Sequence, residues 1–175
     1  MTATNAAVPG EPPEAIRVPA FNTMPDRQAR EVLLGCCRAG RWAEKVAAGR
    51  PYRSLDSLLT QAAAALSDQD VTEALAGHPR IGEARAAAHS SWSRGEQAGV
   101  SGSGDAVLAG LAAGNQAYEE RFGHIYLVCA SGRSAAELLA ILRDRLRNDP
   151  DTERQVTRDE LRKINELRLT KLIAS

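Results

Sequence analysis

Residues 149–172 read DPDTERQVTRDELRKINELRLTKL, and this stretch indicates the kind of fold that the chain can adopt. The Asp149-Pro150 pair is typical of a helix start, because proline is preformed for the first turn of a helix. At about 100° per residue, Leu161, Ile164 and Leu172 fall on one apolar stripe. The stretch therefore predicts a long helix, ending near Leu172, that buries one face.

The composition favours helices in the rest of the chain as well. Of the 175 residues, 43% are hydrophobic but only 4% are aromatic, so the core must consist mainly of Ala, Leu, Val and Ile. Alanine is a strong helix former and a poor strand former. Ser54 and Ser134 each precede a run with helical periodicity and can cap it, and either Ser67 or Asp68 can cap a further helix. We expect an all-α fold, a compact single domain of several helices.

Two stretches do not fit a helical pattern. Residues 1–20 contain four prolines and little apolar periodicity, so we expect a disordered or loosely packed tail, followed by a helical domain over residues 21–175. Residues 125–130 are strand-like, but one isolated strand cannot make a sheet. We therefore expect an extended segment between helices at that place.

Charge, cysteine content and motifs exclude several classes of function. The 22 basic and 22 acidic residues balance, which argues against nucleic acid or membrane as a partner. The arginine-rich stretch 143–168 also holds seven acidic residues, which is typical of a helix surface with many salt bridges. Three cysteines without a CxxC pair, and no secretory signal, favour the cytoplasm. No metal-ligand spacing or phosphate-binding loop is present, so we expect no metal.

Three residues stand out as candidates for chemistry, each with a competing structural interpretation. His78 lies in a rigid turn before Pro79, although a lone histidine is more often structural. Arg168 falls inside the apolar stripe, where a guanidinium needs a carboxylate or a ligand, unless it snorkels to solvent. Glu96 is the last residue of a Ser-x-x-Glu capping box that starts at Ser93, and it could instead face a pocket.

Taken together, six motifs in order resemble the 2-oxo-4-hydroxy-4-carboxy-5-ureidoimidazoline (OHCU) decarboxylases. The resemblance runs from about Phe21 to Leu172. It is carried by Arg50-Pro51-Tyr52, His78-Pro79-Arg80-Ile81-Gly82, Ser93-x-x-Glu96-Gln97-x-Gly99, Tyr118-x-x-Arg121-Phe122-Gly123, Arg145-Leu146-x-Asn148-Asp149 and Lys163-Ile164-x-x-Leu167-Arg168-Leu169. The chain departs from many members after Phe122-Gly123, where it has His124-Ile125-Tyr126.

The resemblance implies a cofactor-free carboxy-lyase that converts OHCU to (S)-allantoin, the last step of urate degradation to allantoin, and that is often a homodimer. It implies His78, Glu96 and Arg168 as catalytic residues. It further implies a substrate-binding set: Pro79, Ser93, Arg94, Gly95, Gln97, Tyr126, Leu127, Val128, Cys129 and Ala130. The substrate supplies an imine as its own electron sink, so no cofactor is needed.

Two other functions are compatible with the sequence. One is a helical binding or adaptor domain without activity, in which substitution of His78 changes at most the stability. The other is a hydrolase of a related ureide that uses His78 as its base and releases a ring-opened acid rather than CO2.

Overall fold

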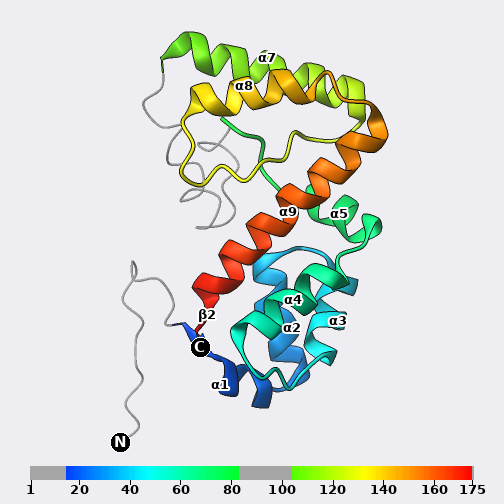
Figure 1. Cartoon of the computed structure of the whole chain (residues 1–175), viewed down its shortest axis with the longest axis vertical. Helices are drawn as coiled ribbons and strands as arrows, with labels where there is room; N and C mark the ends of the chain where they lie inside the picture. Colours follow the sequence, from blue (N-terminus) through cyan, green and yellow to red (C-terminus); the bar gives the residue numbers. More distant parts are fainter. Residues whose placement is uncertain (1–14, 83–103, 175) are drawn as a thin grey trace, which may run out of the picture.

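The computed structural model describes residues 15–82 and 104–174, and this part of the chain is mostly helical (Figure 1). In chain order the elements are β1 (Ile16–Arg17), α1 (Val18–Thr23), α2 (Asp26–Cys36), α3 (Gly40–Ala48), α4 (Leu55–Ala65), α5 (Asp68–Leu75), α7 (Asp105–Phe122), α8 (Ala135–Arg145), α9 (Pro150–Leu172) and β2 (Ile173–Ala174). The all-α prediction is confirmed, and the two short strands add only one parallel pair.

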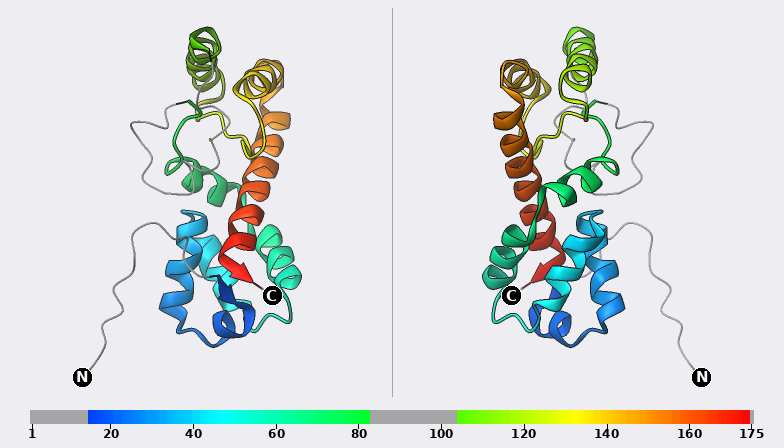
Figure 2. Two further views of the ribbon diagram at one scale, coloured as in Figure 1. Left: turned by 90° about the vertical axis from the view of Figure 1, so that its left-hand side faces the viewer. Right: turned by 90° about the vertical axis from the view of Figure 1, so that its right-hand side faces the viewer.

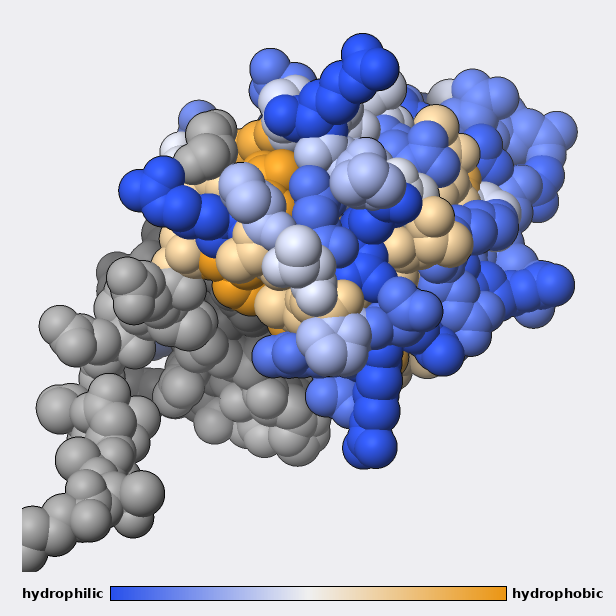
Figure 3. All heavy atoms as spheres, turned by 90° about the horizontal axis from the view of Figure 1, so that it is seen from below, coloured by the Kyte–Doolittle hydropathy of each residue, from blue (hydrophilic) through white to orange (hydrophobic). Residues whose placement is uncertain are grey.

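Helices α1 to α4 enclose a lower core around Trp42 and Phe21, both fully buried. The indole Nε1 of Trp42 donates a hydrogen bond to the Ala62 carbonyl, 2.8 Å away, so this large ring has no unsatisfied polar atom. Arg50, from the first family-like motif, donates to the carbonyl oxygens of Phe21 and Met24 at 2.9 and 2.6 Å. It thereby ties the end of α3 to the end of α1. Seen from below, the lower core is covered mainly by hydrophilic side chains with some apolar groups between them (Figure 3).

Helices α7 and α8 lie side by side and form an upper core (Figures 1 and 2). Their close approach depends on Gly114, since a Cβ atom there would lie 2.5 Å from the side chain of Leu142. Gly123 ends α7 in the left-handed conformation, with φ 75°, which a glycine adopts without strain.

Helix α9 joins the two cores (Figure 2). Its 23 residues span roughly 35 Å. The Asp149 side chain accepts hydrogen bonds from the amides of Asp151 and Thr152, so the predicted helix start is confirmed. The upper turns bury Glu153 and Thr157, whereas the lower turns bury the Leu161–Ile164 stripe. The helix thus carries polar groups into one core and apolar groups into the other.

The helix starts predicted at Ser54 and Ser134 are confirmed, and of the two candidates Ser67 and Asp68 it is Ser67 that caps α5. Each of these three serines accepts a hydrogen bond from the amide three residues on. Residues 16–20, which the prediction placed in a tail over residues 1–20, belong to β1 and α1, and residues 1–14 lie outside the described residues. Ile16 pairs with Ile173 and Val18 is buried. No described helix is both long and apolar enough to cross a membrane.

Candidate active site

His78 follows the last turn of α5, and its ring is fixed by the backbone of that helix. Its Nδ1 lies 2.8 Å from the carbonyl oxygen of Ala74. Because a carbonyl only accepts hydrogen bonds, Nδ1 carries the hydrogen. In the neutral ring Nε2, which is buried, is then the basic nitrogen. The helix end therefore selects the tautomer and the orientation of the imidazole.

The rest of the His78–Gly82 motif is held on α7. Arg80 forms two hydrogen bonds to Glu119, with Nε 2.5 Å from Oε1 and Nη2 2.8 Å from Oε2. The hydrogen bond from Arg80 lowers the pKa of Glu119 below its ordinary value. Asn115 donates to the Ile81 carbonyl at 2.9 Å. The turn after His78 is thus attached to the upper core at two points.

Arg168 is buried on α9, with only 5% of its surface exposed. Its Nη1 donates to the carbonyl oxygen of Cys36, 2.7 Å away, at the C-terminus of α2. The snorkelling interpretation is therefore wrong. Ile164, on the preceding turn of the same apolar stripe, is buried as well.

A polar cluster that the sequence did not reveal surrounds Arg168. The Cys37 thiol lies in the electrostatic field of both Arg168 and Asp70 and within hydrogen-bonding reach of Asn165. Burial raises the pKa of Cys37 to about 11, so it stays a thiol at neutral pH. Asp70 is fully buried, and Ser67 donates to its Oδ2 through the backbone amide at 2.9 Å. The Ser67-x-x-Asp70 spacing is a signal for a helix cap and gives no sign of this burial.

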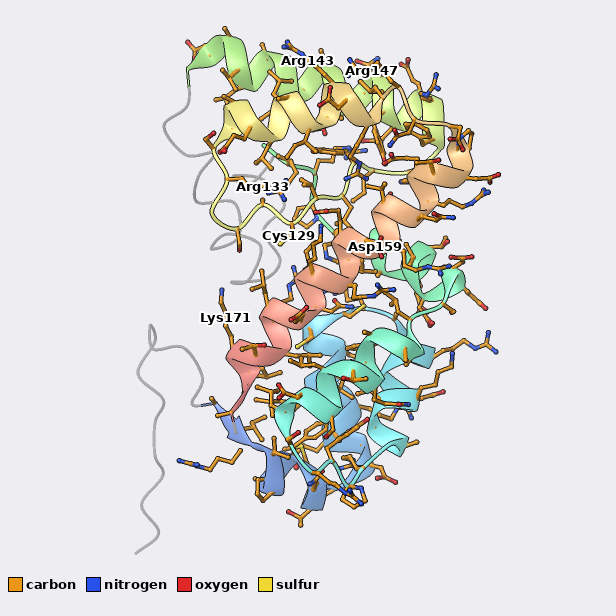
Figure 4. The ribbon with its side chains drawn as sticks, in the orientation of Figure 1. Cys129, Arg133, Arg143, Arg147, Asp159 and Lys171 are labelled. Atoms are coloured by element: carbon orange, nitrogen blue, oxygen red, sulfur yellow. The ribbon has the colours of Figure 1, made fainter. Side chains whose placement is uncertain are left out.

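Residues 125–130 form the expected extended segment, which lies between the two cores. Tyr126 and Val128 pack into the upper core, whereas Leu127 is buried in the lower core and Cys129 packs against it. This alternation is the period of two that an extended chain produces. Figure 4 shows Cys129 on the segment beside α9.

A buried polar network supports this segment from α8 and α9. The guanidinium of Arg145 donates to Leu127 O at 2.6 Å and to Glu153 Oε1 at 2.8 and 2.5 Å. Tyr118 donates its hydroxyl hydrogen to the same carboxylate. Burial raises the pKa of Tyr118 to about 12, so the phenol stays protonated. Burial alone would lower the pKa of Arg145, but its hydrogen bond to Glu153 raises it above the ordinary value.

Three of the predicted groups of site residues lie on helix α9 or on segments next to it. Arg168 belongs to α9, α5 packs against α9 and leads to His78 and Pro79, and segment 126–130 lies against the middle of α9. Glu96 and the predicted binding residues Ser93, Arg94, Gly95 and Gln97 lie outside the described residues. Across residues 15–82 and 104–174, no group of three or more His, Cys, Asp or Glu side chains could hold a metal ion.

This arrangement supplies complementary chemical groups. The imidazole of His78 can accept a proton at Nε2 and donate it again from the same nitrogen. The guanidinium of Arg168 is a planar cation that recognises carboxylate or carbonyl oxygens through parallel hydrogen bonds. The extended segment offers backbone groups at fixed positions. Together they suit a small, polar, anionic molecule that undergoes proton transfer.

Comparison with known proteins agrees with this description. The family model for OHCU decarboxylase matches residues 22–170. A uric acid degradation bifunctional protein, TTL, of Arabidopsis thaliana is 33% identical over 147 residues, which cover 79% of this chain and 45% of that protein. A 2-oxo-4-hydroxy-4-carboxy-5-ureidoimidazoline decarboxylase of Amia calva is 42% identical over 59 residues, 34% of each chain.

A crystal structure of an OHCU decarboxylase in the presence of (S)-allantoin has the same fold, with a TM-score of 0.71 at 28% identity. The match covers 85% of this chain and 98% of that one. The matched part of this chain spans less than half the length of the two curated relatives. Because the family model covers most of its residues, the chain belongs to the OHCU decarboxylase family.

Proposed function

We propose that this protein decarboxylates OHCU to (S)-allantoin, the final step in the conversion of urate to allantoin. The observation that carries the proposal is the His78 ring, whose Nδ1 is tied to Ala74 so that Nε2 is its basic nitrogen. The resemblance to the family implies His78 as the catalytic histidine, and this residue lies within the family match over residues 22–170. The buried guanidinium of Arg168 supports the same assignment.

The reaction needs orientation and controlled proton transfer. When the carbon–carbon bond to the carboxylate breaks, CO2 leaves and the electron pair moves toward the neighbouring C=N bond. The hydroxyl group on the same carbon then loses its proton to become a carbonyl, the adjacent ring carbon gains one, and the former imine nitrogen takes up one further proton from solvent. His78 Nε2 is the group that we propose for proton transfer at the hydroxyl. Delivery of the proton to one face of the ring gives a single enantiomer.

Arg168 is the group that we propose for holding the substrate's oxygen atoms. A guanidinium fixes a planar ligand through parallel donors, which restricts rotation of the reacting centre. We assign Glu96 to the ureido and ring N–H groups, because a carboxylate accepts hydrogen bonds from such donors. Pro79, Ser93–Gln97 and Tyr126–Ala130 complete the proposed binding set.

We further propose a homodimer that needs no cofactor, as the family resemblance implies, and a cytoplasmic location, which the cysteine content favours. Light scattering measures the assembly state directly. A mass of one chain at working concentration would contradict the dimer, whereas the decarboxylase assignment does not depend on it.

The decisive experiment generates OHCU in solution from urate with the upstream enzymes and follows circular dichroism. OHCU decays spontaneously to racemic allantoin, so optical activity above that background reports the enzyme. Formation of (S)-allantoin with release of CO2 supports the proposal. A ring-opened acid identifies a ureide hydrolase instead, and no optical activity leaves the adaptor interpretation.

A further inference from the structure

The extended segment is held by hydrogen bonds along one of its two backbone edges. The carbonyl of Leu127 accepts from Arg145 at 2.6 Å, and the amide of Cys129 donates to Glu160 Oε2 at 2.8 Å. In an extended chain, the carbonyl of one residue and the amide two residues later point to the same side. Both bonds therefore belong to the edge that faces α8 and α9.

The opposite edge belongs to Val128, the residue between them. Its backbone amide and carbonyl point away from Arg145 and Glu160, because these groups alternate along an extended chain. Val128 is buried, with 3% of its surface exposed, and its backbone forms no hydrogen bond to another described residue. Buried backbone groups are almost always paired. This edge therefore has one amide and one carbonyl available for a ligand.

The two side chains that hold the segment, Glu160 and Arg145, are themselves held in place by hydrogen bonds and nearby charges. Burial tends to raise the pKa of Glu160, but hydrogen bonds from Lys163 and the Cys129 amide, with the nearby charge of Arg133, lower it below the ordinary value. Lys163 Nζ lies 2.6 Å from Glu160 Oε1. The Arg145 side chain is fixed by Glu153 and by Thr157 Oγ1, 3.1 Å from its Nη2. Neither anchor can rotate freely.

Helix α9 also sets the distance between this segment and the proposed substrate arginine. Glu160 and Arg168 are eight residues apart on one continuous helix, which corresponds to about 12 Å along its axis. The Cys129 amide is bound to the first, and the second is anchored at Cys36. The backbone edge of Val128 and the guanidinium of Arg168 are therefore held at a fixed separation along α9.

We infer that Glu160 and Arg145 are positioning residues. They clamp Leu127 and Cys129 so that the free backbone edge of Val128 meets the planar ring of the substrate at a set distance from Arg168. This inference rests on the proposed function, because it assumes that the segment contacts an allantoin-like ring. Neither side chain takes part in the chemical step.

The test uses the full-length protein and (S)-allantoin as the probe, with binding measured by titration calorimetry. Glu160→Ala removes the acceptor for the Cys129 amide, and Glu160→Gln restores a neutral one. Hydrogen bonds to charged groups correspond to roughly tenfold or more in affinity. We expect Glu160→Ala to bind (S)-allantoin at least about tenfold more weakly and Glu160→Gln to recover part of that loss. Glu166→Ala, an exposed position on the same helix, should bind like the parent.

Steady-state kinetics separates positioning from a general loss of structure. We expect a raised KM with a smaller change in kcat in Glu160→Ala, at a temperature where circular dichroism shows it fully folded. Unchanged affinity and KM in the folded variant would overturn the clamp. A fall in kcat alone would also overturn it, as would a loss of affinity in Glu160→Gln as large as that in Glu160→Ala. If the parent protein neither binds (S)-allantoin nor produces it, the proposed function itself is refuted. This outcome is measured on the parent alone and does not depend on any variant.

Discussion

The ring of His78 is bonded through Nδ1 to the carbonyl of Ala74, four residues earlier, at 2.8 Å. The carbonyl belongs to the last turn of α5 and also accepts a hydrogen bond from the Gly77 amide, 3.0 Å away. The additional bond from Nδ1 fixes the imidazole against the end of the helix. The same bond leaves proton exchange to Nε2, so the two ring nitrogens have separate roles.

Substitution of His78 by asparagine separates these roles. The amide nitrogen of asparagine can replace Nδ1 as the donor to Ala74, but nothing replaces Nε2. Loss of one well-placed acid or base costs about 10²–10⁴-fold in rate. We expect His78→Asn to lose activity by that factor while its melting temperature stays close to the parent's. His124→Asn is the control, because His124 packs edge-on against Tyr118 and has no proposed catalytic part. Near-full activity in His78→Asn would remove this residue from the mechanism.

Metal chelation tests whether the substrate alone accepts the electron pair. Its C=N bond lies next to the carbon that loses CO2, and this is the role that a metal or an organic cofactor fills in other decarboxylases. We expect activity to survive exhaustive dialysis against EDTA, measured as the rate of (S)-allantoin formation. Restoration of a lost activity by one divalent ion would contradict the mechanism.

The buried pair of Arg145 and Glu153 predicts strong non-additivity in stability. Glu153→Met leaves the Arg145 guanidinium buried without its carboxylate, at a cost of about 3–5 kcal/mol. Addition of Arg145→Met removes that stranded charge. We expect the double variant to be more stable than Glu153→Met alone, although Leu127 then lacks its donor. Urea unfolding measures the free energy of unfolding of each variant. If the losses of the two single substitutions simply add in the double variant, the two side chains are not coupled.

The lowered pKa of Glu160 predicts how one part of the stability depends on pH. A carboxyl group whose pKa is lower in the folded protein stabilises the fold above its unfolded pKa and loses that effect as the pH falls through the folded value. We therefore expect the parent to be more stable than Glu160→Gln above about pH 5. The difference should shrink as the pH falls below the ordinary value of 4.5. A difference that grows toward acid pH would contradict this assignment.

Helix starts were predictable because they depend on local chemistry. The serines at positions 54, 67 and 134 identify their helices, and Asp149-Pro150 locates the start of α9. The β1–β2 pair was missed, because each strand has only two residues and such a short strand carries no periodic signal. The buried charges were misjudged for a related reason. Glu153 and Glu160 belong to a stretch that resembles a solvated salt-bridge surface, yet α8 and segment 125–130 cover them.

The candidate site was predictable only where one residue broke a local pattern. Arg168 interrupts an apolar stripe, and His78 precedes a proline, so both stood out without any knowledge of their neighbours. Asp70 did not stand out, because its place in a capping box explains it locally. Its burial beside Cys37 arises only when α2, α5 and α9 come together. Contacts of this kind are long-range, and a single sequence does not encode them in any short pattern.

Arg168 is the residue for which a structural and a functional role predict different results. Its Nη1 bond to Cys36 O is a structural contact that a lysine ammonium can replace, because one donor suffices for one carbonyl. Recognition of a planar substrate instead needs two parallel donors, which lysine cannot supply.

We therefore expect Arg168→Lys to fold like the parent, with a melting temperature within a few degrees, and to lose most of its turnover. Arg168→Met removes a buried guanidinium, but it also leaves the Cys36 carbonyl without this donor, at a cost of roughly 1–3 kcal/mol. It should be inactive, and its loss of stability should stay within that range. Thermal melts and allantoin formation, measured on both variants, decide between the roles. If Arg168→Lys keeps its activity while Arg168→Met unfolds many degrees earlier, the arginine is structural, and His78 must act with a different cation.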